Sequence, residues 1–447
     1  MEGGSGMLIA DIGWMRGHGR KKLCPKLRHE VINAYRPHGW LPCFVQPLIG
    51  KWRKRFKFIE VIVENQPCCQ DEELVSIKEA VERHKCKVTH ELPIINGFAG
   101  RVNLNALSEL AAHPGVKKIW LDRDVHAVLD VASPVLGAPE SWDLGYSGDG
   151  VTVAVIDTGI YPHPDLTRPN NRLVAFRDFV KNKTDFYDDN GHGTHVAGCI
   201  AGNGYGSGGK YKGTAPGAKL VGIKVLDRLG SGKLSQVIAG IQWCIEQQEK
   251  LGIRVINLSL GSSAQNGYQD DPVCGAVEKA WQAGIVVVAA AGNEGPEQGT
   301  VSSPGIDPTI ITVGATDDKN NVPKNDDIIA EFSSRGPTVD GLAKPDVVAP
   351  GVNIISLAAP GSLLYKQMKK NRVGTAYLSM SGTSMATPLC AGVVALILQA
   401  FPRLVPDQVK ALITGTAKPL SHSRSDEGAG YVDALSCVQS LKVEEGQ

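Results

Sequence analysis

The chain has 447 residues, of which 42% are hydrophobic, so it exceeds one average domain and we expect one large domain plus one smaller one. Its formal net charge of +1 conceals two opposite halves. Residues 1–133 carry 20 Lys and Arg against 15 Asp and Glu, whereas residues 134–447 carry 27 against 31. This balance argues against a nucleic-acid binder, whose basic charge would dominate its domain, and suits two modules that dock on each other.

Targeting signals and cysteine usage indicate where the protein works. The apolar run at 7–10 is interrupted by Asp11, so no secretory signal is visible, and no transmembrane run is found. The ten cysteines divide five and five between the halves, without the spacing of a small disulfide-rich domain, which favours reduced thiols. We therefore expect a cytoplasmic protein that does not bind a membrane.

Residues 1–55 read as a basic N-terminal extension. It runs into KWRKRFK at 51–57, where Trp52 and Phe56 are interleaved with cations. Such a pattern also occurs in nucleic-acid and membrane contacts, but so short a run favours a solvated or domain-facing strip.

Residues 56–132 alternate between strand and helix patterns in the order βαββαβ. The expected strands occupy 56–64, 88–92, 97–104 and 116–122, and the expected helices occupy 71–85 and 106–113. This order predicts a small ferredoxin-like α+β domain, a common fold that carries no function by itself.

Residues 133–447 form the larger predicted domain. Its apolar runs are continuous rather than alternating, which is typical of parallel strands covered on both faces. The expected strands are 151–156, 219–226, 254–260, 284–290, 309–315 and 345–351, with helices at 234–252 and 272–284. Because ligands bind beyond the carboxyl ends of such strands, the residues just after each run are the candidates for function.

Three segments carry candidate chemistry, and the first follows the strand VTVAVI. Asp157 stands at its end, where a buried carboxylate needs a partner. An aspartate that caps the following turn is an equally good local interpretation. The partner of Asp157 therefore decides between the two.

The second segment, NGHGTHVAG at 190–198, contains His192 and His195 and is followed by Cys199. On a helix these three residues fall at i, i+3 and i+7, on one face, where they could bind zinc. The helix of zinc proteases, however, spaces its histidines four apart with a glutamate between them. The segment alone leaves a zinc site and a catalytic base open.

The third segment is SGTSMATP at 381–388, followed by a long apolar run. Ser384 would lie at the start of a buried helix, where free backbone N–H groups favour developing negative charge. Gly382 permits close approach of a substrate, and Pro388 cannot donate the helical bond that the Ser384 carbonyl would otherwise accept. A plain N-cap serine is the alternative.

The order Asp157, His192, Ser384 is one of three orders in which Asp/His/Ser triads occur. The blocks IDTG, NGHGTHVAG and SGTSMATP resemble the signatures of the subtilisin-like serine proteases, and KVL, INLSLG, AAAGN and FSSRGP extend the resemblance over residues 140–437. The N-terminal half, including PHGWLPCF, resembles that of the AprX-type intracellular subtilases of bacilli. The resemblance implies a subtilisin-like α/β fold and a serine endopeptidase.

The same resemblance implies a role for each matched residue. Ser384 is the nucleophile, His192 the general base, and Asp157 the group that orients it. Asn293 and the backbone N–H of Ser384 are the two oxyanion donors. The alternative for Asn293 is a turn asparagine. His195 is then a bystander, with Cys199 a small buried neighbour.

Substrate recognition, by resemblance, is strand pairing of an extended peptide, and the first specificity pocket lies beside it. Ser302 falls at the pocket floor, where many relatives have glycine, and Glu294 stands near its rim. Side-chain directions cannot be read from the sequence. The pairing segments are Gly230, Ser231 and Gly232 on one side and Ser259, Leu260 and Gly261 on the other, and the pocket wall comprises Ala290, Ala291 and Gly292.

Relatives need no cofactor for the chemistry, but they often hold structural calcium through an aspartate matching Asp165 and a nearby loop. The corresponding loop at 203–213 lacks carboxylates, so the metal question stays open. A zinc-dependent hydrolase and a non-catalytic peptide-binding protein are the rival interpretations. The intact triad and Asn293 speak against both.

Activation should follow the family's zymogen plan, with residues 1 to about 132 as chaperone and intramolecular inhibitor. The segment HAVLDVASPV at 126–135 reads as apolar and extended, without strong helix signals. We therefore predict self-cleavage between about Leu129 and Pro134.

Overall fold

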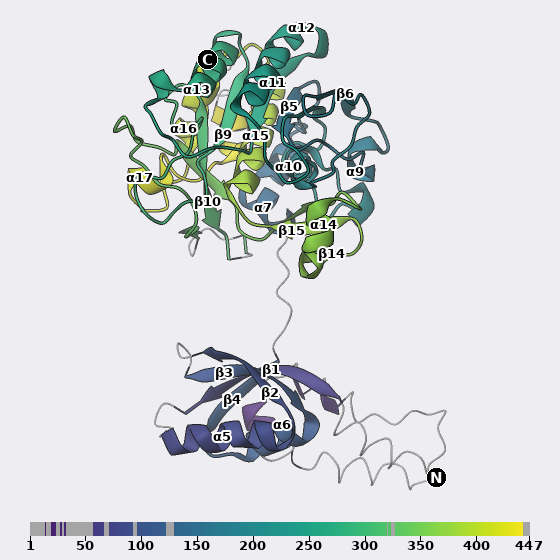
Figure 1. Ribbon diagram of the computed structural model, residues 1–447, viewed down its shortest axis with the longest axis vertical. Coiled ribbons are helices and arrows are strands. Elements are labelled where there is room, and N and C mark those ends of the chain that lie inside the picture. The colour runs from purple at the N-terminus through teal and green to yellow at the C-terminus, as the bar shows by residue number, and fades with distance from the viewer. Residues whose placement is uncertain are drawn as a thin grey trace. The chain divides into compact units, whose positions relative to one another are not determined.

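The computed structural model describes residues 57–66, 71–92, 96–121, 129–319, 321–322 and 327–440, with 14, 19–23, 27–28 and 31–32. The chain divides into two compact units, Met1–Val125 and His126–Gln447 (Figure 1). The predicted domain boundaries, after residues 55 and 132, stay predictions. The basic strip at 51–57 lies, apart from Lys57, outside the described residues.

The smaller unit is an antiparallel sheet in the order β2-β3-β1-β4. This is the ferredoxin-like order that the βαββαβ pattern predicts. Its core includes Val61 and Val63 of β1 and Leu107 and Leu110 of α6, all with no exposed surface. The elements are α2 (Arg20–Lys22), β1 (Phe58–Asn65), α5 (Asp71–Arg83), β2 (Lys87–Leu92), β3 (Gly97–Asn103), α6 (Leu104–Ala112) and β4 (Val116–Leu121).

The larger unit is built on a sheet in the order β11-β10-β9-β8-β5-β7-β6, with β12 also paired to β10. All pairings are parallel except β10 with β11, which confirms the predicted α/β class. The edge strand β6 was not predicted, because its pattern of half-exposed residues lacks a continuous apolar run. The strands are β5 (Thr152–Asp157), β6 (Leu173–Asp178), β7 (Lys219–Lys224), β8 (Ile253–Leu258), β9 (Val286–Ala290), β10 (Ile311–Asp317), β11 (Ile328–Ile329) and β12 (Val347–Pro350).

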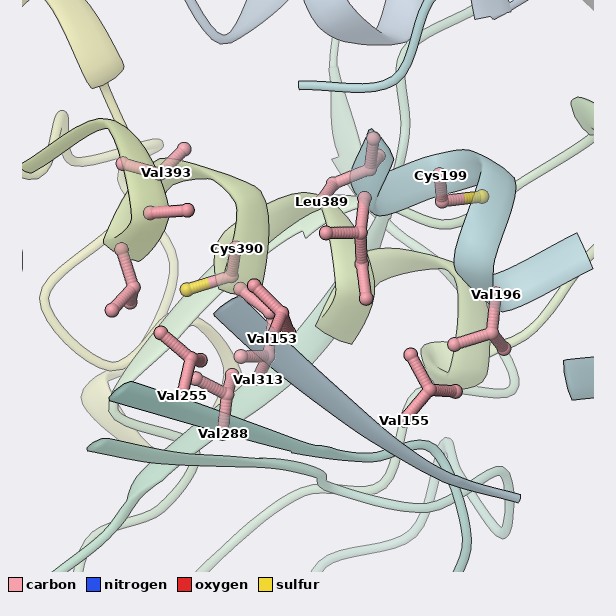
Figure 2. Packing of buried hydrophobic residues seen from close by; sticks show 14 of the residues in the cluster. Val153, Val155, Val196, Cys199, Val255, Val288, Val313, Leu389, Cys390 and Val393 are labelled. Atoms are coloured by element: carbon pink, nitrogen blue, oxygen red, sulfur yellow. The ribbon is translucent and has the colours of Figure 1, made fainter. Parts of the chain in front are cut away.

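Helices cover both faces of this sheet. Val155 points toward α10 (His192–Ala201) and α15 (Thr383–Ala400), whose side chains pack over Val153, Val255 and Val288 (Figure 2). The next residue along β5, Ile156, faces Gly240 of α11 (Leu234–Glu246) instead. Because successive strand residues point to opposite faces, α11 and its neighbour α13 (Pro272–Gln282) cover the other face.

The central helix α15 is long and apolar enough to cross a membrane, although no transmembrane run was expected. In the structure 83% of it is buried, and it contacts β5, β8, β9 and β10. Its composition is therefore explained by its place as the core helix of the larger unit.

Two further features depart from the sequence prediction. Residues 129–135 form helix α7 (Leu129–Val135), so the extended interpretation of this segment is wrong. The helix is held because Ala132 and Val135 are buried and Ser133 Oγ donates to Lys212 O at 2.9 Å. A small antiparallel sheet, β13-β15-β14, was also not predicted.

The remaining elements are short and connect these layers. They are β13 (Ile354–Leu357), β14 (Arg372–Val373), β15 (Tyr377–Met380), α8 (Ala138–Asp143), α9 (Pro164–Thr167), η3 (Tyr205–Ser207), α12 (Gln248–Leu251), η4 (Tyr268–Asp270), α14 (Leu363–Gln367), η6 (Lys369–Asn371), α16 (Pro406–Thr416), α17 (Arg424–Glu427) and α18 (Ala434–Ser440).

Candidate active site

The partner of Asp157 is His192. Asp157 ends β5 and has no exposed surface, and its two carboxylate oxygens lie 2.8 and 3.0 Å from His192 Nδ1. Burial opposes a charge on the imidazole, but the adjacent Asp157 carboxylate outweighs it, and the pKa of His192 lies above its ordinary value. The His192 side chain keeps 19% of its surface exposed. The Nδ1 edge of the ring is therefore fixed by a carboxylate, while part of the ring remains accessible from outside.

A second buried carboxylate, Asp188, holds this pair in place. It accepts hydrogen bonds from the backbone N–H groups of Asn190, Gly191 and Thr194 and from the hydroxyls of Thr158 and Thr194. Burial raises the pKa of Asp188, and these hydrogen bonds oppose that shift.

Thr158 extends this network to helix α10. Its Oγ1 donates to Asp188 and accepts from Gly193 N–H, so it connects the end of β5 to the start of α10. Asp188 and Thr158 were not predicted as site residues, because both look like ordinary turn residues in the sequence. Their only signal was their position beside Asp157 and His192.

Ser384 and Ser259 exchange two hydrogen bonds across the cleft. Ser384 Oγ donates to Ser259 O at 3.2 Å, and Ser259 Oγ donates to Ser384 O at 3.0 Å. In a regular helix the Ser384 carbonyl would accept from the N–H of residue 388, but Pro388 has no N–H. The second bond supplies a donor to this carbonyl in its place. Between these two described residues, the Ser384 hydroxyl and His192, there is no hydrogen bond. Catalytic hydrogen bonds often form only when substrate is bound.

The orientation of the Asn293 amide follows from its contacts with Thr383. Asn293 Oδ1 accepts from the Thr383 N–H at 2.8 Å and from its hydroxyl at 2.9 Å. Because a backbone N–H can only donate, the amide oxygen must face Thr383 and the NH2 group must face away. A Cβ on Gly382, whose φ is 153°, would lie 3.4 Å from that nitrogen. Glycine thus keeps the space beside the donor open.

Of the predicted substrate residues, all but Ala291 line two cavities that share Leu260 and Gly261. The larger, of about 560 Å³, also contains Gly230, Ser231, Gly232 and Ser259 and reaches His192. The smaller, of about 340 Å³, contains Ala290, Gly292, Asn293 and Ser384. A continuous cleft therefore runs past both His192 and Ser384.

Ala291 was predicted to form part of the pocket wall, but it does not line the cavity. It has no exposed surface, whereas Ala290, the last residue of β9, and Gly292 both line the cavity.

Ser302 and Glu294 both line the smaller cavity. A Cβ built on Gly292 would lie 2.4 Å from Ser302 Oγ, so the Ser302 hydroxyl faces the wall of the cavity. Glu294 is exposed, and its N–H donates to Ser334 Oγ at 3.1 Å. The Ser302 side chain therefore occupies volume in this pocket, and Glu294 adds a carboxylate to its lining.

His195 is a structural residue. Its Nε2 lies 3.0 Å from both Ile354 O and Leu378 O, which connects α10 to β13 and β15. Burial lowers the pKa of His195 to about 3, so its ring is neutral. With both ring nitrogens engaged, Nδ1 facing Cys199 Sγ at 3.8 Å, it cannot join His192 in binding zinc. Among the described residues there is no group of three His, Cys, Asp or Glu side chains that could hold a metal.

The surroundings of Asp165 do not fit a calcium ion. Its carboxylate accepts from Gly206 N–H at 2.8 Å and from the Tyr377 hydroxyl at 2.9 Å, and it has no exposed surface. The guanidinium of Arg172 donates to the backbone carbonyls of Asp165 and Ala201, oxygens of the kind that would otherwise bind calcium. Protein donors therefore take the place that a cation would need.

The fold and the site together define a serine hydrolase on a mostly parallel α/β sheet. The sequence matches the model of the subtilase family over residues 148–432. It is 46% identical over 427 residues to "Serine protease AprX" of Bacillus subtilis (strain 168), covering 93% of this chain and 96% of that protein.

Two subtilisins are also similar. Identity is 39% over 297 residues to Subtilisin Savinase of Lederbergia lenta, covering 66% of this chain and 94% of that protein. It is 35% over 368 residues to Subtilisin E of Bacillus subtilis, covering 81% and 86%. The chain therefore belongs to the subtilase family and is a serine endopeptidase, as the resemblance implied.

Proposed function

We propose that Ser384, His192 and Asp157 hydrolyse peptide bonds as nucleophile, general base and orienting carboxylate. On substrate binding the Ser384 hydroxyl turns from Ser259 O to His192 Nε2. Its oxygen attacks the scissile carbonyl while His192 takes the proton, and His192 then gives that proton to the departing amine. Water attacks the resulting ester by the same route and frees Ser384. The observation that carries this proposal is the contact of Asp157 with His192 Nδ1, which leaves Nε2 as the acceptor.

The oxyanion of each tetrahedral intermediate would be bound by the Asn293 NH2 group and the backbone N–H of Ser384. The first donor is oriented by Thr383, and the second lies in the first turn of α15, where it has no helical partner. Both donors are in place before the negative charge forms.

The substrate would be an extended polypeptide paired with Gly230–Gly232 and Ser259–Gly261, its first specificity side chain in the cavity of Ser302 and Glu294. Backbone pairing reads no side chains, so specificity should be broad. Ser302 should disfavour large side chains and Glu294 acidic ones. Ser302→Gly should raise kcat/KM for Phe or Tyr more than for Ala at that position.

Active-site labelling tests the catalytic proposal against its rivals. A serine-directed fluorophosphonate should label Ser384 and abolish casein hydrolysis, whereas a zinc-selective chelator should leave hydrolysis unchanged. A non-catalytic peptide-binding protein would show no hydrolysis before labelling. Full activity after stoichiometric labelling would contradict the role of Ser384.

We further propose that the chain is a zymogen that cleaves itself, with the smaller unit acting afterwards as inhibitor. Helix α7 argues against a cut between Leu129 and Pro134, because a paired substrate must be extended and this segment is helical and partly buried. The boundary between the two compact units, near Val125, is the better location. Purified Ser384→Ala protein should remain at 47.6 kDa while the active protein shortens.

The inhibitor role is tested by adding back the smaller unit. Residues 1–133 are net positive and the remainder net negative, so inhibition should weaken at high salt. Trimming of the Ser384→Ala protein at the same bond would contradict self-cleavage. Unchanged peptidase activity with the added unit would contradict inhibition.

We also propose a cytoplasmic location. The described cysteines are all free thiols, and five of them, in the larger unit, are buried, which suits a reducing compartment. Fractionation of the native host with an antibody to this protein tests the proposal.

A further inference from the structure

The segment formed by α14, η6 and β14 borders the catalytic cleft and is not used by the proposed mechanism. Leu364, on α14, lines the larger cavity, and so does Met380, at the end of β15. The chain therefore lines the cavity at Leu364 and again at Met380, and the residues between these two positions do not line it. In Figure 1 α14, β14 and β15 form one group at the edge of the larger unit.

This segment is fixed directly to the residues that precede the catalytic histidine. The first N–H groups of α14, at Leu363 and Leu364, donate to Asp189 O at 3.0 Å and Asn190 O at 2.9 Å. A Cβ on Gly191 would lie 2.7 Å from Ser362 Oγ, so the two segments are in close contact. The position of α14 is thereby coupled to the loop that carries His192.

The rest of the segment is held by its own contacts. The Arg372 guanidinium lies 3.9 Å from the centre of the Tyr365 ring, and its Nε donates to Tyr365 O at 2.8 Å. Tyr365 OH donates to Thr375 O, and Asn371 Nδ2 donates to Ser379 O. The Arg372 guanidinium is therefore engaged by Tyr365, and this contact holds the segment together.

Three other cationic side chains in this described segment lack an ion-pair partner. Lys366, Lys369 and Lys370 are exposed, and within the described part of the chain none of their ammonium groups has an ion-pair partner. No acidic residue occurs between Asp346 and Asp407, so the segment carries no carboxylate of its own. The acid near its attachment point, Asp189, is already paired with Lys181 and Lys224.

We infer that Lys366, Lys369 and Lys370, the lysine patch, form a secondary substrate-binding surface that selects polypeptides with acidic residues a few positions from the scissile bond. This deepens the proposed function by adding a charge preference away from the first specificity pocket. A strand held in the cleft passes Leu364, and a long flexible lysine beyond it can reach a carboxylate on that strand. Unpaired cations on a segment that contributes Leu364 to the cleft wall favour an acidic occupant over a neutral one.

The test compares two matched pairs of fluorogenic peptides, built on a casein sequence that the enzyme cuts. The two peptides of a pair have the same residues at the scissile bond and differ at three flanking positions, which are all Glu in one peptide and all Gln in the other. These positions lie on the leaving-group side of the bond in the first pair and on the acyl side in the second. At low salt kcat/KM should be roughly three- to tenfold higher for the Glu peptide in at least one pair, the size expected of two or three exposed charge pairs. The preference should reside in KM and disappear at 1 M salt, where the screening length is about 3 Å.

A triple variant, Lys366→Gln with Lys369→Gln and Lys370→Gln, should lose the preference and retain its activity on Gln peptides. The matched control, Lys219→Gln with Lys250→Gln and Lys279→Gln, removes the same charge away from the cleft and should keep the preference. Equal rates for Glu and Gln peptides in the parent enzyme would overturn the inference while leaving the endopeptidase function intact. So would a preference that survives in the triple variant and is lost in Lys233→Gln, since Lys233 also lines the cleft.

Discussion

Ser259 Oγ supplies the hydrogen bond that the Ser384 carbonyl cannot receive from Pro388. This bond joins the end of β8 to the first turn of α15, at the residue proposed to be the nucleophile. A helix that begins Thr-Ser-Met-Ala-Thr-Pro would otherwise leave that part-buried acceptor without a protein donor.

Removing the Ser259 hydroxyl should therefore cost stability in a way that depends on Pro388. Ser259→Ala should lower the free energy of unfolding by about 1–3 kcal/mol, the cost of an unsatisfied buried acceptor. In a Pro388→Ala background the new N–H can bind Ser384 O, so the same change should cost less. Urea unfolding of the four proteins, each carrying Asn293→Ala to slow self-digestion, measures the coupling. Equal costs in both backgrounds would contradict the explanation.

The two histidines of the HxxH pair should separate in kinetics and stability. His192→Ala should lower kcat by roughly three or more orders of magnitude, as loss of a triad member does. His195→Ala should cost mainly stability, about 1–3 kcal/mol, since this buried ring bridges α10 to β13 and β15. Kinetics and thermal unfolding of both proteins provide the measurement. Equal catalytic losses in two folded variants would refute the assignment.

The contact between Thr383 and Asn293 should matter for turnover rather than binding. Asn293→Ala should lower kcat about 10²- to 10³-fold with little change in KM, because the oxyanion exists only beyond the ground state. Thr383→Ser, which keeps both donors, should be far less affected than Thr383→Val, which keeps only the N–H. An effect confined to KM would indicate that Asn293 binds the substrate ground state.

The pH profile should reflect the Asp157–His192 contact. Only neutral His192 can accept a proton, so activity should rise as pH increases through its pKa. Burial favours the neutral ring, but Asp157 raises the pKa, so the acid limb should lie above the ordinary histidine value of about 6.5. Asp157→Asn removes the raising charge, and its residual activity should show a limb at lower pH. A limb that does not move would contradict the electrostatic role of Asp157.

The network around Asp165 should make the fold independent of calcium. Unfolding temperatures of Ser384→Ala protein in millimolar EDTA and in millimolar calcium should agree. Tyr377→Phe removes the donor to Asp165 Oδ2 and should cost about 1–3 kcal/mol. A calcium-dependent rise in the unfolding temperature of the Ser384→Ala protein would contradict this independence.

Much of this architecture could be predicted from local patterns. Continuous Val, Ile and Ala runs indicate strands covered on both faces, and the βαββαβ order predicts the smaller unit because hydrophobic periodicity reflects which faces are buried. The edge strand β6 and helix α7 could not be predicted in this way. Their conformations depend on neighbours distant in sequence, such as Lys212, whose carbonyl accepts from Ser133.

At the site, the residue types that could perform the chemistry and their order along the chain could be recognised before folding was considered. Their partners depend on the folded chain: Asp157 faces His192, Thr383 orients Asn293, and Ala291 is buried outside the cavity lining. The fold also connects Asp188 to Thr158, and it attaches the segment that carries the lysine patch to the loop before His192. The physical reason is that hydrogen bonds and charge pairs act over a few ångströms, whereas the residues that make them here are separated by tens to hundreds of positions.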